Sequence, residues 1–184
     1  ILFVGDGMGI STVTASRIFD GQSRGEPGEE NYLSFEKFPS VALVKTYNSD
    51  SQVPDSAGTA SALNTGVKAP IGTLNIFDGQ RKKACPTNQA IFPMSLAEIA
   101  ESKGLSTGIV TTARVTHATP AAVYSHSPNR NWEADINIPE ESIRMGCVDI
   151  AKQLVDFPYG DGIDLVLGGG IRNFLPKEKG GIRQ

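Results

Sequence analysis

Long apolar runs and a marked excess of charge of either sign are both missing from this sequence. No stretch approaches the roughly 18 apolar residues that a membrane-spanning helix needs. The 17 lysines and arginines nearly balance the 20 aspartates and glutamates, and the net charge of -3 argues against a basic nucleic-acid-binding surface. We interpret the one basic cluster, Arg81 to Lys83, as a solvated loop. The composition, 39% hydrophobic and 20% charged, is typical of a globular protein.

Cysteine and histidine are also scarce, with two of each. Cys85 and Cys147 could form a disulfide or be two unrelated buried thiols, and their number alone does not decide between these alternatives. If they pair, the loop between them contributes roughly 4 kcal/mol in the chain-entropy model, and the protein belongs in an oxidising compartment. His117 and His126 are the only histidines that could act as a general base.

The two ends of the sequence suggest that these residues are a piece of a longer chain. The sequence begins at Ile1, without Met or a signal-peptide pattern, inside an apolar run that we expect to be a central strand. It finishes in the polar, glycine-rich stretch "KEKGGIRQ". The length predicts one domain over residues 1–184, because a domain typically takes roughly 100 to 200 residues.

Expected strands and helices alternate along the chain. Apolar or β-branched runs predict strands at residues 1–5, 41–47, 106–115 and 164–170. Helical patterns and caps predict helices at residues 12–19, 57–64, 95–104 and 139–157. Residues 70–93 show no clean period, and we predict a surface excursion there. The alternation predicts a doubly wound α/β fold, with a mainly parallel sheet and helices on both faces, whose ligands gather at the carboxyl ends of the strands.

"GDGMG", residues 5–9, follows the first expected strand and contains the first candidate site residue, Asp6. The third glycine of a dinucleotide-binding fingerprint would fall on Ile10, so that function is disfavoured. A carboxylate flanked by glycines at a strand end suits a metal cation that must also admit a substrate. Asp6 could instead simply cap the following turn.

"VPDSAGTASALNTG", residues 53–66, places Asp55 and Ser56 where a helix would begin. Either residue could serve as a helix cap. Ser56 could also be a nucleophile, because a helix N-terminus favours negative charge and binds phosphate or sulfate. The flanking residues do not form the G-x-S-x-G pattern of an α/β-hydrolase, so a metal ion is the better candidate for deprotonating the hydroxyl.

"RVTHATPAAVYSHSPNRNW", residues 114–132, follows another expected strand. On an extended strand end His117 and Thr119 would share a face and could reach one cation. Arg114 and Arg130 are candidates for binding a tetrahedral oxyanion, since a guanidinium binds such oxygens in bidentate fashion. Taken singly, each histidine could be structural and each arginine could be a surface residue.

Together, the blocks "LFVGDGMG", "QVPDSAGTASALNTGVK" and "GIVTTARVTHATPAAVYSHSPNRNW" resemble the alkaline phosphatases in order, sequence and spacing. The resemblance extends over essentially all 184 residues and implies the N-terminal portion of one catalytic domain of that fold. It implies that Ser56 is the nucleophile that forms a phosphoserine. It also implies that Arg130 binds phosphate and that Asp55 steadies Arg130.

The resemblance further implies three metal ions, two zinc and one magnesium. Asp6 matches the carboxylate that bridges one zinc and the magnesium site, Ser56 faces the metals, and His117 and Thr119 match ligands of the third site. Because an imidazole is a poorer partner for Mg²⁺ than a carboxylate, the third site could take zinc. The remaining family ligands lie in the C-terminal half, so we expect these residues alone to bind zinc weakly and to be inactive. His126 is interpreted as structural or surface.

Animal alkaline phosphatases pair two cysteines in matching contexts, so the resemblance favours a disulfide between Cys85 and Cys147. It implies a periplasmic, secreted or cell-surface protein, phosphate monoesters as substrates, and a homodimer. The alternatives are a phosphodiesterase of the same superfamily and a non-catalytic phosphate-binding fragment. An arylsulfatase is disfavoured, since Ser56 is not followed by the x-P-x-R of the sulfatase segment.

Overall fold

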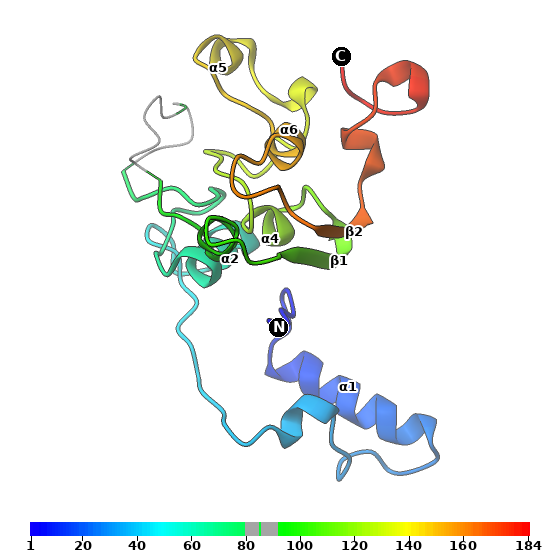
Figure 1. Cartoon of the computed structure of the whole chain (residues 1–184). Coiled ribbons are helices and arrows are strands. Elements are labelled where there is room, and N and C mark those ends of the chain that lie inside the picture. The colour runs from blue at the N-terminus through cyan, green and yellow to red at the C-terminus, as the bar shows by residue number, and fades with distance from the viewer. Residues whose placement is uncertain (80–84, 86–91) are drawn as a thin grey trace. The chain divides into compact units, whose positions relative to one another are not determined.

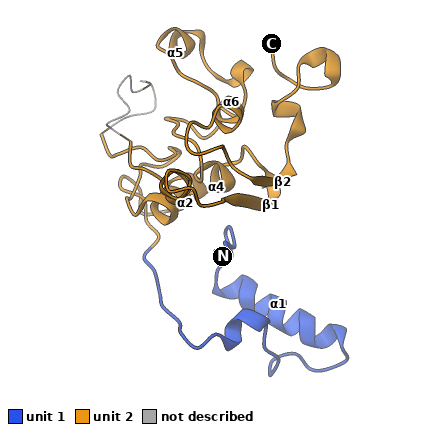
Figure 2. Ribbon diagram, in the orientation of Figure 1, with its two compact units in different colours: residues 1–45 blue, residues 46–184 orange. Residues whose placement is uncertain are grey.

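The computed structural model describes residues 1–79, 85 and 92–184. It divides the chain into two compact units, residues 1–45 and residues 46–184, drawn in blue and orange in Figure 2.

The first unit is built around helix α1, Ile10–Ser23, followed by the 3-10 helix η1, Ser34–Lys37. The helix begins after Gly9, two residues before the start predicted at residue 12. Gly21 lies inside α1 and does not end it. A Cβ atom there would lie 2.6 Å from the Cα of Gly28, so this glycine allows a close backbone approach.

The predicted strands at residues 1–5 and 41–47 are absent, which corrects the sequence-based assignment. Both segments lack regular secondary structure and have largely exposed side chains, as in Ile1 and Leu43. An apolar run indicates a preference for burial, but a strand exists only when a second strand accepts its hydrogen bonds. Among the described residues, neither segment pairs with a strand.

The second unit contains a parallel sheet of two strands, β1 (Gly108–Arg114) and β2 (Leu165–Gly169), which lie side by side in Figure 1. The register pairs Gly108 with Leu165 and Val110 with Leu167, and becomes irregular before Arg114. These two strands confirm the predicted strands at 106–115 and 164–170 and the parallel α/β class. The connection between them contains helices, as parallel pairing requires.

The core of this unit lies between α2 (Ser56–Thr65), α4 (Ala118–Ala121) and the sheet. Both helices present alanines to the same cluster, among them Ala57 and Ala121, which are fully buried. These small side chains let the two helices approach closely. Larger side chains such as Leu74 fill the remaining space, and burying each contributes roughly 1.5–3 kcal/mol.

Two sequence predictions in this unit need correction. The single helix predicted over residues 139–157 is two helices, α5 (Glu140–Arg144) and α6 (Ile150–Val155), separated by Gly146 in a left-handed conformation with φ of 87°. The surface excursion predicted over residues 70–93 is wrong at its start. Residues 73–76 are buried there, and Leu74 forms an antiparallel bridge with Ser127. Residues 80–84 and 86–91 of that segment lie outside the described residues.

Helix α3, Leu96–Glu101, has the predicted N-terminus. The Ser95 side chain accepts a hydrogen bond from the Glu98 N–H, and the Glu98 carboxylate accepts one from the Ser95 N–H. This reciprocal capping box satisfies two amide groups that the helix itself cannot. The remaining elements among the described residues are short 3-10 helices: η3 (Asp135–Asn137), η4 (Ile171–Asn173) and η5 (Lys177–Lys179).

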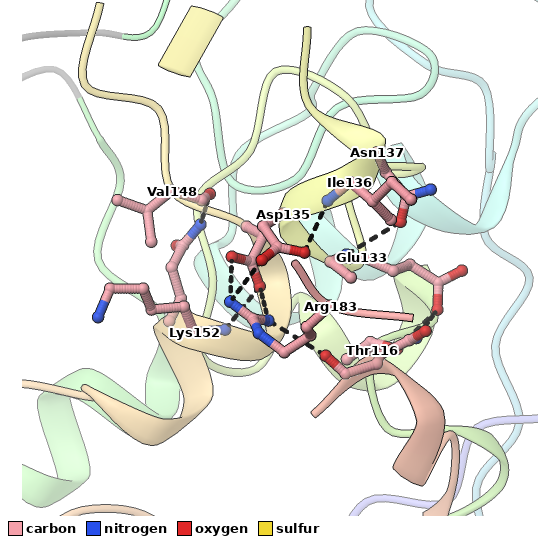
Figure 3. Close-up of polar contacts among 12 residues, drawn as sticks. Thr116, Glu133, Asp135, Ile136, Asn137, Val148, Lys152 and Arg183 are labelled. Carbon is pink, nitrogen blue, oxygen red and sulfur yellow. Dashed lines mark hydrogen bonds and ion pairs between the residues drawn. The ribbon is translucent and has the colours of Figure 1, made fainter. Parts of the chain in front are cut away.

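A disulfide and a salt bridge connect the chain around α5 and α6. Cys85 and Cys147 form a disulfide with a Cα–Cα distance of 5.3 Å, which confirms the predicted pair. Arg183 binds both carboxylate oxygens of Asp149, the cap of α6, and Figure 3 shows the same arginine beside Asp135. None of the helices in the described part of the chain combines the length and hydropathy that a membrane crossing demands.

Candidate active site

The candidate site starts at the N-terminus of α2, where Asp55 is the cap and Ser56 the first helical residue. The backbone of Asp55 is extended, with φ of -121° and ψ of 166°, and its Oδ1 accepts a 3.0 Å hydrogen bond from the Gly58 N–H. The cap therefore holds Ser56 in the first helical turn, where the amide groups and the helix dipole favour negative charge.

The Asp55 carboxylate accepts four hydrogen bonds. Besides Gly58, Oδ1 accepts from Asn48 Nδ2 at 2.9 Å, and Oδ2 accepts from the Gly72 N–H and from Arg130 Nη1, both at 3.0 Å. Burial alone would raise the pKa of Asp55. The hydrogen bonds, led by the one from Gly58, outweigh burial and lower this pKa below its usual value. Asp55 is therefore ionised at neutral pH and forms an ion pair with Arg130.

Arg130 joins Asp55 to two other predicted site residues. Its Nη1, bound to Asp55, is also 3.3 Å from Ser56 Oγ, and its Nη2 is 3.3 Å from His117 Nε2. The backbone N–H of Arg130 donates to Gly72 O at 2.9 Å, so main chain and side chain are both anchored. We call Asp55, Ser56, His117 and Arg130 the Ser56 cluster.

His117 and Thr119 lie close to one another in sequence but do not share a strand end, contrary to the prediction. His117 is the extended residue before α4, and Thr119 lies within that helix. Both are partly buried. The hydrogen bond from Arg130 uses His117 Nε2 as acceptor, which fits a neutral imidazole whose Nε2 lone pair faces the cluster.

Arg114 does not belong to the cluster, so its prediction as a phosphate-binding fork is wrong. Its Nε and Nη2 bind the two carboxylate oxygens of Glu133 at 2.8 and 2.7 Å. Glu133 also accepts hydrogen bonds from Thr116 Oγ1 and Asn173 Nδ2, and Figure 3 shows Thr116 beside it. Burial raises the pKa of Glu133, but Arg114 and these donors outweigh burial and lower this pKa below its usual value. Glu133 therefore stays ionised and keeps the Arg114 guanidinium in an ion pair.

Asp6 lies in an exposed turn of the first unit, before α1. His126 has the structural contacts that the sequence suggested, with Nε2 2.7 Å from Glu98 Oε1 and Nδ1 3.0 Å from Asn75 O.

A cavity of about 350 Å³ lies beside His126 and Cys147, but no residue of the Ser56 cluster lines it. Within the described ranges, no three His, Cys, Asp or Glu side chains come together as a metal site.

The amino-acid sequence of the chain, including the Ser56 cluster, matches a known family. The family model described as Alkaline phosphatase covers residues 1–183. The chain belongs to the alkaline phosphatase family. Its sequence is 51% identical over 178 residues to the tissue-nonspecific alkaline phosphatase isozyme of Gallus gallus, covering 96% of this chain and 34% of that protein. The chain thus spans about a third of the length of the curated relatives it matches.

Solved alkaline phosphatases share the fold. The cold-active enzyme from the psychrophile Shewanella sp. matches with a TM-score of 0.67 and 29% identity, covering 96% of this chain and 37% of that chain. A TAB5 alkaline phosphatase variant, with a histidine replaced by glutamate and Mg bound in its M3 site, matches with a TM-score of 0.66 and 27% identity. It covers 92% of this chain and 38% of that one. These similarities confirm the predicted alkaline-phosphatase-like α/β fold.

Proposed function

We propose that this chain supplies part of the active site of a phosphomonoesterase that acts through a phosphoserine at Ser56. The observation that carries the proposal is the 3.3 Å contact between Arg130 Nη1 and Ser56 Oγ, made while the same nitrogen is 3.0 Å from Asp55 Oδ2. A guanidinium held beside the nucleophile can bind two oxygens of a phosphoryl group. Phosphoryl transfer depends mainly on such positioning and on neutralising charge.

Each residue of the proposed reaction has one task. Ser56 Oγ loses its proton and forms a bond to phosphorus while the bond between phosphorus and the alcohol oxygen breaks. That oxygen takes up a proton and leaves as the alcohol, and Arg130 holds two of the other phosphate oxygens. Water then attacks the phosphoserine, the P–Oγ bond breaks, one proton of the water returns to Ser56 Oγ, and inorganic phosphate leaves. Asp55 does not touch phosphate in this scheme. It orients Arg130 and balances its charge.

The donor chemistry of the cluster fits part of a metal site. Ser56 Oγ and His117 Nε2 each lie 3.3 Å from a nitrogen of Arg130, so a hydroxyl and an imidazole face the same guanidinium. Oxygen and imidazole donors suit zinc. We propose Ser56, His117 and Thr119 as ligands in a site for two zinc ions and one magnesium ion, with further ligands supplied by residues outside this chain. Asp6, in the first unit, is proposed as a metal ligand from the sequence resemblance alone. When bound, these cations favour a deprotonated serine and neutralise phosphate charge.

The third metal position is proposed to accept zinc as well as magnesium. Magnesium prefers oxygen ligands, and His117 offers nitrogen. The TAB5 variant that holds Mg in its M3 site carries glutamate in place of a histidine, which supports this reasoning.

The proposed substrates are small phosphate monoesters, because the side chains of the Ser56 cluster are suited to binding the phosphoryl group and none of them is assigned to the alcohol. The Cys85–Cys147 disulfide supports an oxidising location, such as the periplasm, the cell surface or the extracellular space. Assembly as a homodimer is proposed from the family resemblance alone.

Steady-state kinetics of the full-length protein test the proposal. We expect hydrolysis of p-nitrophenyl phosphate to far exceed that of bis(p-nitrophenyl) phosphate, and Ser56→Ala to abolish it. A preference for the diester would favour a phosphodiesterase instead. The isolated 184 residues should show no turnover, and full activity of this polypeptide would contradict the proposed need for further ligands.

A further inference from the structure

Asn48 is a buried side chain that contacts the cluster from behind. It is 2% exposed, and its Nδ2 donates a 2.9 Å hydrogen bond to Asp55 Oδ1. The other oxygen of that carboxylate, Oδ2, accepts the hydrogen bond from Arg130 Nη1. Asn48 is therefore two hydrogen bonds away from the guanidinium that contacts Ser56.

The helix α2 makes room for this amide. A Cβ atom on Gly58 would lie 2.7 Å from Asn48 Oδ1 and 2.9 Å from its Nδ2, closer than such atoms can approach. Glycine is otherwise unfavourable in a helix, since it loses the most conformational freedom on folding. An unfavourable helical residue thus lies at the point where Asn48 reaches Asp55.

The hydrogen-bonding pattern of Asn48 indicates that its side-chain N–H, rather than its side-chain oxygen, is the group that contributes to the site. In the part of the chain that the structure describes, no donor reaches its buried Oδ1. A buried acceptor without a partner disfavours folding. An asparagine is therefore a poor choice for packing alone, but a good one for presenting an N–H to a carboxylate.

We propose that Asn48 is a positioning residue for phosphate binding, acting on Arg130 through Asp55. Its N–H fixes the rotation of the Asp55 carboxylate, so that Oδ2 stays directed at Arg130 and the Gly72 N–H. Without this bond the carboxylate can rotate, and Arg130 is held less firmly beside Ser56. The inference rests on the proposed function, in which Arg130 binds phosphate.

The experiment compares Asn48→Ala with Asn75→Ala in the full-length protein and measures competitive inhibition by inorganic phosphate. Asn75 is a matched control, because it is fully buried and donates to Ala122 O and Ser125 O rather than to the cluster. Both variants should lower the melting temperature. Because a hydrogen bond to a charged group is lost, we expect about a five- to tenfold higher inhibition constant in Asn48→Ala and a change below about twofold in Asn75→Ala.

Gly58→Ala is a second test that leaves Asn48 in the protein and displaces its amide. It should raise the phosphate inhibition constant in the same direction. Combined with Asn48→Ala it should add little, since the clashing amide is gone. If Arg130→Ala weakens inhibition by phosphate while Asn48→Ala and Gly58→Ala leave it unchanged, the proposed role of Asn48 is overturned. If Arg130→Ala has no effect either, the proposed function itself fails.

Discussion

Replacing Arg130 by lysine keeps the positive charge but removes the planar fork. The guanidinium reaches Asp55 Oδ2 and Ser56 Oγ with Nη1 and His117 Nε2 with Nη2. A single ammonium group cannot span these positions and also present two donors to phosphate. The substitution therefore tests whether the fork, rather than charge alone, matters.

The size of the effect follows from the contacts that lysine cannot make. A hydrogen bond to a charged group contributes about 1.5–3 kcal/mol, and one such bond to phosphate is lost. Because about 1.4 kcal/mol is a factor of ten in rate, kcat/KM should fall roughly 10- to 100-fold. Folding should change much less, since Asp55 keeps its hydrogen bonds from Gly58, Asn48 and Gly72.

The assay is kcat/KM of the full-length Arg130→Lys variant with p-nitrophenyl phosphate, beside urea unfolding to show that the variant is folded. Arg114→Lys is the control, because that arginine binds Glu133 and lies outside the Ser56 cluster. A folded Arg130→Lys variant that keeps wild-type kcat/KM would refute the reasoning, as would an equal loss in Arg114→Lys.

Three further predictions concern charge, covalent linkage and metal choice. Burial raises the pKa of Asp55, but its hydrogen bonds outweigh burial and hold the pKa in the folded protein below the ordinary value of 3.8. The ionised carboxylate therefore stabilises the fold above that ordinary value. This stabilisation is lost as the pH falls through the lower pKa of the folded protein. Asp55→Asn should therefore flatten the fall in unfolding free energy below about pH 5, measured by urea titration, and an unchanged acid slope would contradict this. Replacing Cys85 and Cys147 by serine opens a 62-residue loop and should lower the free energy of unfolding by roughly 4 kcal/mol; the wild type should then respond to reductant and the variant should not. His117→Asp should raise the ratio of magnesium to zinc retained by the full-length protein, measured by elemental analysis, because a carboxylate suits Mg²⁺ better than imidazole. An unchanged ratio would argue against His117 as a third-site ligand.

Local signals in the sequence predicted the features that depend on neighbouring residues. Asp55 before a run of small residues predicted the start of α2, and the helix predicted from residue 95 begins at the capping box of Ser95 and Glu98. Each pair lies within one helical turn, so no distant contact is needed. Gly146 carried a similar local signal, and its left-handed backbone separates α5 from α6, although the apolar pattern suggested one continuous helix.

Features that depend on distant residues were not accessible in this way. Whether the run at residues 1–5 forms a strand depends on a pairing partner that its own sequence does not specify. Arg114 and Arg130 belong to the same sequence block, and only the fold places Glu133 beside one and Asp55 beside the other. Asn48 carried no motif at all. Its contribution arises from burial and from the space left by Gly58.

Trapping the covalent intermediate tests the central claim most directly. The full-length protein is mixed with a phosphate monoester, quenched in acid, digested and analysed by mass spectrometry. We predict one phosphoryl group on the peptide that contains Ser56, and its loss in Ser56→Ala. A phosphoryl group on another residue, or turnover that persists in Ser56→Ala, would contradict the assignment of Ser56 as the nucleophile.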